Sequence, residues 1–411
     1  MSKFITRTTH NNPVFFDNDP QDELMTLNIG PTHPATHGVF QNVCQVDGER
    51  IVSAVSTIGY IHRAFEKIAE HRPFYQITPL TDRLNYCSSP INNMGYHMTV
   101  EKLLNIEIPK RVQYMRVIVM ELARITDHII CNGILGVDTG AFSGFLYVLQ
   151  EREFIYEIYE EICGARLTTN IGRIGGFERD FNEVAFRKIR EFLERFPPVL
   201  REFEELFVRN RIFIERTSGV AAVTPEQALS YSWSGPILRA TGVDYDVRAV
   251  APYCSYEEFD FEVPVGTTGD VYDRFMVRNA EMWQSLRIIE QALEKIAKEP
   301  TGIFHADVPE FYLPPKEQVY NNMEALIYHF KIVMGEWETP VSEVYQAVEG
   351  ANGELGFYLI HDGGRTPYRL HFRRPSFINY QMFASMSSGM LISDAIINMS
   401  SLNVIAGELD A

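Results

Sequence analysis

Residues 109–130 read PKRVQYMRVIVMELARITDHII and carry a helical pattern. Apolar side chains recur at intervals of three and four residues, as they do along one face of an α-helix. Pro109 stands where a first helical turn accepts proline, because the N–H that proline lacks would have no partner there. The apolar positions are Val112, Met115, Val119, Leu122, Ile125 and Ile129. This stretch therefore predicts a long helix with one buried face.

Helical patterns continue on both sides and predict a helical core from about residue 90 to residue 335. One of these helices, within 266–298, has Thr268 or Asp270 as a suitable N-cap. Its buried face would carry Phe275, Met282, Leu286, Ile289, Leu293 and Ile296. The other predicted helices cover 140–162, ending at Cys163-Gly164, about 181–209, and 314–334.

Small antiparallel β elements are predicted at both ends of this core. Asp47-Gly48 between two β-rich runs predicts a hairpin over about 38–58. Alternating residues predict further strands over about 343–375, joined at Asn352-Gly353 and at Asp362-Gly363-Gly364. The predicted fold class is therefore α+β, predominantly helical, with a helical bundle beside small antiparallel sheets.

The remaining segments complete the predicted organisation of the chain. Residues 60–70 read as a short helix, and C-terminal helices are expected over about 379–402. The first 27 residues are polar and irregular, so we expect an N-terminal arm over 1–27 and a single domain over 28–411. No repeat or flexible linker divides that domain.

Composition excludes several classes of protein. With 411 residues, 45% of them apolar, the chain can bury a large core. A net charge of −17 without basic clusters argues against nucleic-acid binding. No apolar run is long enough for a membrane span, and the start lacks a signal-peptide pattern, so we expect a cytoplasmic protein. Five scattered cysteines form no C-x-x-C pair and predict reduced thiols rather than a metal site.

The stretch NIGPTHPATHGVF, residues 28–40, places His33 and His37 four residues apart. A helical metal site would need this spacing, but Pro34 moves His33 out of the helical region and the glutamate of zinc proteases is missing. Gly38 and the nearby prolines favour a loop that carries polar side chains into a cavity. A turn in which both histidines are only structural remains the alternative.

Other polar residues are ambiguous when they are taken one by one. Tyr86 precedes a predicted helix and is either a buried aromatic or a proton donor, while Cys87 beside it reads as a packing residue. Asp138 is expected at a helix entrance, where it would be an N-cap or part of a site. Asp270, Asp273, Arg274 and Arg278 have spacings that predict local ion pairs. GTTGD and GRIGG match neither nucleotide-binding motif and read as loops.

Read together, several stretches resemble one family across residues 25–411. That family is the D subunit (49 kDa-type subunit) of respiratory complex I, the NADH–quinone oxidoreductase, whose fold is similar to that of the large subunit of nickel–iron hydrogenases. The resemblance implies a peripheral subunit of a proton-translocating quinone reductase on the cytoplasmic face of the plasma membrane. The matching stretches are GPTHPATHGV, IGYIHRAFEK, DRLNY, IPKRVQYMRVIVMELARI, GARL, GRIGG, PVGTTGDVYDRFMVR, MEALIYHFK and GELDA.

The resemblance also assigns roles to residues. It implies that His37 and Tyr86 hydrogen-bond and protonate the quinone head, that Gly38 and Leu146 also border it, and that Asp138 supports His37. Quinone reduction makes the carbonyl oxygens basic, so donors must already be in place. Tyrosine and histidine have reference pKa values of about 10 and about 6.5, and both can donate a proton.

Metal chemistry is expected on a neighbouring subunit. The hydrogenase family holds its metal with two pairs of cysteines, and this chain has only Cys87 and the terminal GELDA at those positions, so a nickel–iron site is not expected. The resemblance implies a 4Fe–4S cluster in a neighbouring subunit, with Arg63 beside it. Thr168 replaces a histidine that many members carry near that cluster. This difference suggests a less pH-dependent, lower cluster potential and a quinone such as menaquinone.

The resemblance implies partners and leaves alternatives open. The expected partners are the iron–sulfur B subunit, the C subunit, the H subunit in the membrane, and quinone, with no nucleic acid. One alternative is a related complex that takes electrons from ferredoxin or another donor instead of NADH. A hydrogenase-like metalloenzyme and an assembly scaffold without a redox role are two further alternatives.

Overall fold

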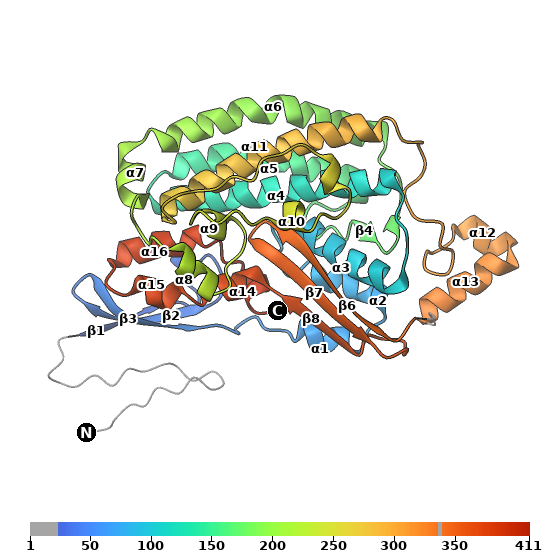
Figure 1. Ribbon diagram of the computed structural model, residues 1–411, viewed down its shortest axis with the longest axis horizontal. Coiled ribbons are helices and arrows are strands. Elements are labelled where there is room, and N and C mark those ends of the chain that lie inside the picture. Colours follow the sequence, from blue (N-terminus) through green and yellow to red (C-terminus); the bar gives the residue numbers. More distant parts are fainter. Residues whose placement is uncertain (1–23, 336–338) are drawn as a thin grey trace, which may run out of the picture.

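The computed structural model describes residues 24–335 and 339–411. Its centre is helix α4 (Lys110–Asp138), which packs against α5 (Phe142–Cys163) and α11 (Val271–Ile296). Helix α6 (Glu183–Val208) covers α5 and α11 from outside. Figure 1 shows the four helices alongside one another, above the two larger sheets. The helices predicted within 109–130, 140–162, 181–209 and 266–298 correspond to these four helices, and α5 ends at Cys163 before Gly164 as expected.

Helix α4 is buried on nearly all sides and not on one face alone. Its charged residues are paired inside the protein, which lets a helix with an apparently polar face lie in the core. Arg116 is 2.5 Å from Glu101, and Glu121 lies between Arg124 and Arg248. Burial raises the pKa of Glu121, but the two arginines outweigh burial and hold it at about 2.

Helix α11 agrees closely with the prediction made from its sequence. The Asp270 side chain caps it by accepting a hydrogen bond from the backbone N–H of Asp273 at 2.8 Å. All six residues of its predicted apolar face are buried. The predicted ion pairs in this segment are wrong: Arg274 donates to side chains of Asn398 and Ser401, and Arg278 donates to the carbonyl of Ser401.

The N-terminal sheet has three antiparallel strands, β1 (Met25–Ile29), β2 (Gln41–Asp47) and β3 (Arg50–Thr57), in that order. The predicted hairpin is β2–β3, but its turn residues are Gly48 and Glu49, because Asp47 pairs with Arg50. Strand β1 begins inside the range predicted for the irregular arm. Its pairing with β2 is a tertiary contact that local polarity does not reveal.

The second sheet is formed by β6 (Ser342–Gly350), β7 (Gly353–His361) and β8 (Arg369–Arg373), and it packs on α3 (Ser89–Leu104). Its first turn is Ala351-Asn352 and not Asn352-Gly353, because Gly350 pairs with Gly353. Two-stranded β4 (Gly172–Arg173) and β5 (Gly176–Phe177) form a separate small sheet.

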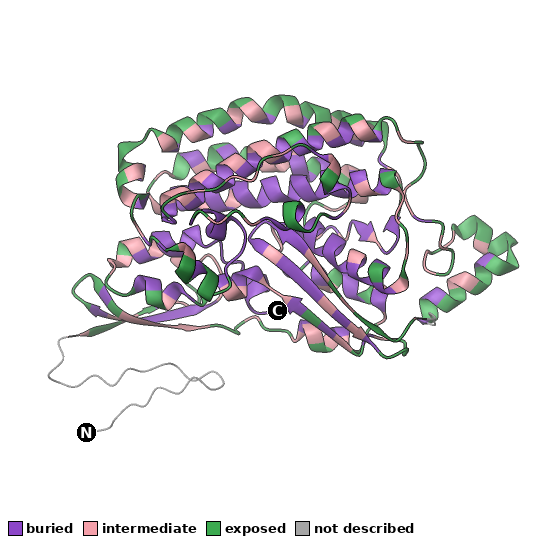
Figure 2. Cartoon of the chain, viewed as in Figure 1, coloured by how far each residue is buried: buried purple, intermediate pink, exposed green. Residues whose placement is uncertain are grey.

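Shorter helices surround the core, and Figure 2 shows that α12 and α13 are mostly exposed whereas α4 is buried. The range 314–334 is two helices instead of one, and the short helix expected over 60–70 begins only at Phe65. No helix in the described ranges combines the length and the apolar character needed to cross a membrane. The shorter helices are α1 (Phe65–Ala69), α2 (Phe74–Thr81), α7 (Arg211–Thr217), α8 (Pro225–Ser230), α9 (Pro236–Arg239), α10 (Val247–Val250), α12 (Lys316–Asn321), α13 (Met323–Met334), α14 (Pro375–Tyr380), α15 (Phe383–Ser387), α16 (Ile392–Ser401) and α17 (Ala406–Leu409).

Candidate functional site

The loop between β1 and β2 carries the two histidines on either side of a 3₁₀ turn, η1 (Pro34–Thr36). Nδ1 of His33 accepts a hydrogen bond from the backbone N–H of Ala35 at 3.1 Å. The hydroxyl of Thr36 contacts the carbonyls of His33 and Gly38 at 2.7 and 2.8 Å. These short-range hydrogen bonds stabilise the loop, and His33 accepts two of them.

His37 ends the 3₁₀ turn in the left-handed backbone region, with φ +52°. Histidine occupies this region more readily than most residues, so the position suits it. Its Nε2 lies 3.4 Å from Oδ2 of Asp138, which is ion-pair distance but longer than a good hydrogen bond. Of the two histidines in the motif, the structure thus directs His37 toward a carboxylate.

Asp138 is the last residue of α4, so the interpretation of it as an N-cap is wrong. The following helix begins after Ala141, which makes no side-chain cap. A carboxylate at a helix C-terminus is unfavourable because the backbone carbonyls there carry partial negative charge. The hydroxyl of Ser400 on α16 donates to this carboxylate, and His37 approaches it from the other chain segment. Both contacts offset that cost.

Tyr86 lies in the segment between α2 and α3. Burial raises its pKa to about 12, with further increases from Cys87 and Asp127, while a backbone hydrogen bond from Ala406 lowers it. The phenol is therefore neutral and protonated at physiological pH. Burial also raises the pKa of the Cys87 thiol well above its usual range, so Cys87 is not a thiolate.

The short helix α17 packs against both the loop that carries His37 and the segment that carries Tyr86. A methyl group on Gly38 would lie 2.9 Å from Cβ of Ala406. A methyl group on Gly407 would lie 3.1 Å from the ring of Tyr86 and 2.5 Å from the carbonyl oxygen of Arg83. Glycines at these positions allow close approach of the three segments. The small residues of AGELDA were the only sequence signal for this contact.

One buried carboxylate lies on α17 and another lies on α4. Asp127 on α4 accepts hydrogen bonds from Asn85 at 2.7 Å and from Asn403 at 2.6 Å. Glu408 accepts from Ser376 and, at 3.3 Å, from Asn352. Burial raises the pKa of Glu408 to about 7 despite those hydrogen bonds. Pattern reasoning did not single out either carboxylate, because their partners are distant in sequence.

The other predicted residues lie on a loop after β3, a loop after α5 and the start of α5. Arg63 is exposed on the loop after β3, with its guanidinium 4.8 Å from the centre of the Phe65 ring. Thr168 lies in the loop after α5 with φ +50°, an unusual conformation for a β-branched residue. Leu146, 52% exposed, and Phe142, 57% exposed, form an apolar face at the start of α5, close in sequence to Asp138.

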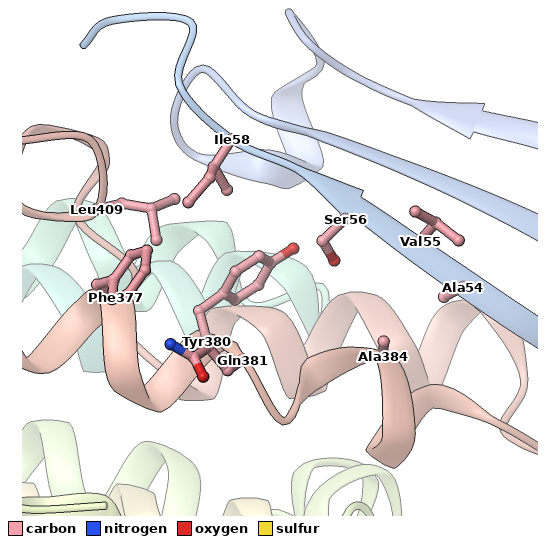
Figure 3. A pocket seen from close by; sticks show the side chains of 9 residues that line it. All are labelled: Ala54, Val55, Ser56, Ile58, Phe377, Tyr380, Gln381, Ala384 and Leu409. Carbon is pink, nitrogen blue, oxygen red and sulfur yellow. The ribbon is translucent and has the colours of Figure 1, made fainter. Parts of the chain in front are cut away.

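A cavity of about 320 Å³ lies between β3 and α14–α15 (Figure 3). None of the predicted quinone-contacting residues lines it. Across residues 24–335 and 339–411, no group of three or more His, Cys, Asp or Glu side chains is placed to hold a metal ion. The cavity is lined by Ala54, Val55, Ser56, Ile58, Phe377, Tyr380, Gln381, Ala384 and Leu409.

Comparison with known proteins identifies the relatives of this chain. Residues 138–411 match the family model of the 49 kDa subunit of respiratory-chain NADH dehydrogenase. The D 2 subunit of NADH-quinone oxidoreductase in Cytophaga hutchinsonii is 71% identical over 390 residues, 95% of this chain and 99% of that protein. The D subunit of the Flavobacterium johnsoniae enzyme is 72% identical over 395 residues, 96% of this chain and 95% of that protein. The C/D subunit of the Bdellovibrio bacteriovorus enzyme is 45% identical over 409 residues, 98% of this chain but 72% of that protein.

Proposed function

We propose that this chain, which belongs to the family of the 49 kDa subunit (the D subunit) of respiratory-chain NADH dehydrogenase, forms the quinone-reduction site with His37, Tyr86 and Asp138. The observation that carries the proposal is the 3.4 Å contact between His37 and Asp138. Helix α17 packs both on the loop that carries His37 and on Tyr86. A histidine held by a carboxylate and a neutral buried tyrosine are two proton donors of different strength.

Reduction of a quinone to a quinol consumes two electrons and two protons. Tyr86 donates its phenolic proton to one carbonyl oxygen, and the His37 imidazolium donates to the other. The products on the protein side are a tyrosinate and a neutral imidazole, both of which regain a proton from the aqueous side. Because burial already disfavours a charged Tyr86, the tyrosinate is short-lived, and its reprotonation is a source of free energy for proton translocation.

The apolar face of α5 suits a hydrophobic substrate. Phe142 and Leu146 are one helical turn apart, and both are more than half exposed. Gly38 leaves the loop free of a side chain next to Ala406. We assign Gly38 and Leu146 to the border of the quinone-binding region, which a neighbouring subunit would complete.

We assign the electron supply to a 4Fe–4S cluster on the neighbouring B subunit, as the resemblance implies. A nickel–iron site does not fit this chain: Cys87 is a single cysteine where hydrogenases have a pair, and the terminal GELDA has none. Arg63 is exposed and therefore available to face that cluster, and Thr168 is assigned to the same side.

The relatives indicate the donor and one partner. Their names specify NADH and quinone, so we assign NADH as the electron source ahead of ferredoxin. The name of the Bdellovibrio relative joins C and D in one chain, which supports direct contact with the C subunit. Contact with the H subunit in the membrane, proton translocation and a position on the cytoplasmic face of the plasma membrane complete the proposal.

The test uses the assembled complex with His37→Ala and Tyr86→Phe. Each should lower NADH-driven quinone reduction about a hundredfold or more, as expected for loss of a general acid. Electron transfer from NADH to a soluble acceptor that bypasses quinone should be unchanged. His71→Ala and Tyr320→Phe, at exposed positions, are matched controls. If both site variants assemble and still reduce quinone at the normal rate, the chain is a scaffold instead.

A further inference from the structure

A charge network inside the protein joins α4, α9, α10, α11 and β6. Among the described residues, three arginines and four carboxylates form it, and each is at most 1% exposed. Arginine keeps its proton in proteins, so four ionised carboxylates would leave this region with a net negative charge. An unmatched charge in a protein interior is costly. The members of the network are Arg124, Arg239, Arg248, Glu121, Asp246, Glu281 and Glu349.

Two of the carboxylates each lie between two arginines. Glu121 is 3.2 Å from Arg124 and 3.2 Å from Arg248. Asp246 is 2.7 Å from Arg248 and 3.5 Å from Arg239. Burial raises the pKa of each carboxyl, but the arginines outweigh burial and hold the pKa at about 2. Both residues are therefore ionised at neutral pH.

Arg239 also contacts the other two carboxylates, but unequally. Oε1 of Glu281 accepts two hydrogen bonds from Arg239, and its Oε2 lies 2.8 Å from Nε2 of His128. The Glu349 carboxyl accepts one hydrogen bond from Arg239 at 2.8 Å and one from the backbone N–H of Val247 at 3.1 Å. Among the described residues, Glu349 thus has a single ion-pair contact, with an arginine that Glu281 already engages.

Negative groups also lie near Glu349. Glu354 is directly opposite it in the antiparallel β6–β7 pair, where like charges repel. Glu354 has a cation of its own, Arg373, at 3.7 Å. Burial raises the pKa of Glu349 above 4.5, and Asp246 raises it further, against the opposing effect of the three arginines. Glu349 is therefore the carboxylate of the network that gains most from a proton.

The charged groups on α3, which packs against β6, do not change this balance. Glu101 pairs with Arg116, and the ammonium of Lys102 donates to the carbonyl of Tyr345. Burial holds the pKa of His97 well below its usual range, so its ring is neutral.

His128 also contacts the network and is the alternative place for a proton. Burial lowers its pKa, although Glu281 acts in the opposite direction. Its Nδ1 is buried without a hydrogen-bond partner in the described part of the chain. An unpaired N–H of an imidazolium costs more than the bare nitrogen of a neutral ring. His128 therefore donates to Glu281 as a neutral ring and does not supply the missing positive charge.

We propose that the charge network is a binding site for a proton, and that at neutral pH the Glu349 carboxyl holds a proton taken from solvent. Three arginines then face three carboxylates, and the interior has no unmatched charge. The proton acts as a structural ligand, because it allows α4, α11 and β6 to meet through charged side chains. This inference concerns no residue assigned to the quinone site, and its test requires no quinone turnover.

Proton binding of this kind links stability to pH. Glu349 has a raised pKa in the folded state and a pKa of 4.5 once the structure opens. Its contribution to stability is therefore complete below pH 4.5 and is lost as pH rises to the pKa of the folded state. Within that window, opening becomes about tenfold more favourable with each pH unit.

Hydrogen exchange in the assembled complex between about pH 5.5 and about pH 7.5 tests the proposal. In wild type, the protection of β6 and α4, corrected for the chemical exchange rate, should fall about tenfold or more with each pH unit. In Glu349→Gln that dependence should be weaker by about tenfold with each pH unit, because no carboxyl remains to titrate. Glu343→Gln, which changes an exposed carboxylate on the same strand, should keep the wild-type dependence.

Glutamine changes the contacts of Glu349 as well as its chemistry. It offers one acceptor oxygen where Glu349 meets both Arg239 and Val247, so protection should be lower at every pH. This loss does not imitate the expected result, because the readout is the change of protection with pH and not its level.

Asp246→Asn tests the charge balance while leaving Glu349 in place. Asparagine can accept from the backbone N–H of Arg248, so the cap of α10 is kept. With one anion removed, three arginines face three carboxylates without the proton, and Glu349 should ionise in the folded state. The pH dependence should weaken as in Glu349→Gln, although the Glu349 carboxyl is still present.

Equal pH dependence in wild type and Glu349→Gln would overturn the proposal. A weaker dependence in His128→Gln but not in Glu349→Gln would also overturn it, because the proton would then reside on the imidazole. If Glu349→Gln does not assemble, Asp246→Asn supplies the measurement. If neither assembles while Glu343→Gln does, the network needs each of its negative charges and holds no proton.

Discussion

Nε2 of His37 lies 3.4 Å from the Asp138 carboxylate, which places a loop of the N-terminal sheet against the C-terminal end of the central helix α4. The hydroxyl of Ser400 is bonded to the same carboxylate. The Ser400 hydroxyl therefore anchors the Asp138 carboxylate and fixes its orientation, while the His37 side of the pair is partly exposed.

Asp138→Asn should weaken quinone reduction without disturbing the fold. Asparagine keeps an acceptor for Ser400, but it removes the negative charge that lies 3.4 Å from Nε2 of His37. We expect kcat for quinone to fall about tenfold to a hundredfold, the effect of losing one charge-assisted contact. The measurement is steady-state quinone reduction by the complex, with Asp362→Asn as control. A fall in assembled complex instead of in kcat would contradict this assignment.

Glu408→Gln should make the folded chain more stable at alkaline pH. Burial raises the pKa of Glu408 to about 7 in the folded state, from 4.5. A raised carboxyl pKa means that the folded state favours the protonated form, so stability is greatest below pH 4.5 and falls as pH rises to about 7. This loss amounts to about 3 kcal/mol, at about 1.36 kcal/mol per pH unit.

Denaturant unfolding at about pH 5 and about pH 8, on either side of that titration, would measure this effect. The glutamine carbonyl oxygen can accept from Ser376 and Asn352 as Oε2 of Glu408 does, so the variant should lose most of the difference between the two pH values. Glu343→Gln, an exposed carboxylate on β6, is a suitable control. An unchanged pH dependence would mean that Glu408 is already neutral or already compensated in both states.

Gly407→Ala should damage the site through backbone displacement. The added methyl group would lie 2.5 Å from the carbonyl oxygen of Arg83 and 2.7 Å from that of Leu84, which are parts of the backbone and cannot rotate away. We expect a destabilisation of about 1–3 kcal/mol and a marked loss of quinone reduction, because Tyr86 must move. Gly364→Ala, whose nearest neighbour is a flexible Asp362 side chain, should be tolerated. Thermal unfolding and quinone kinetics together check both outcomes.

Thr168→His should change the pH response of the neighbouring cluster. Thr168 has φ +50°, which costs a β-branched residue more than it costs histidine. The loop is tied to the Tyr86 segment, because the N–H of Asn170 donates to Asp82 at 3.0 Å. Redox titrations over a range of pH should show little slope for wild type and a proton-linked slope for the variant. A full slope in wild type would refute our account of Thr168.

Much of the helical core could be predicted from local pattern. The spacing of apolar residues predicts α4 and α11, and Asp270 caps α11 as expected. The end of α4 cannot be predicted locally, because Gly133 and Gly136 suggest a break in the helix before Asp138. The structure explains them by packing: a side chain on Gly133 would collide with Phe145, and one on Gly136 with Phe207. Both rings come from other helices, so no local pattern reveals them.

Local pattern likewise predicts only part of the candidate site. The argument against a metal site follows from residues 28–40 alone, whereas the choice of His37 over His33 and its pairing with Asp138 came from family resemblance. Strand β1 and helix α17 act through contacts between distant segments. Sequence-local reasoning has no access to such contacts, because burial and pairing are decided by the whole fold.

The buried position of Ala406 and Gly407 has a consequence for biosynthesis. The His37 loop and the Tyr86 segment leave the ribosome early, but the backbone on which both rest is translated hundreds of residues later. A partly synthesised chain therefore has the His37 loop and the Tyr86 segment without their common support. The packing of these two segments against α17 is completed only after translation has passed residue 407.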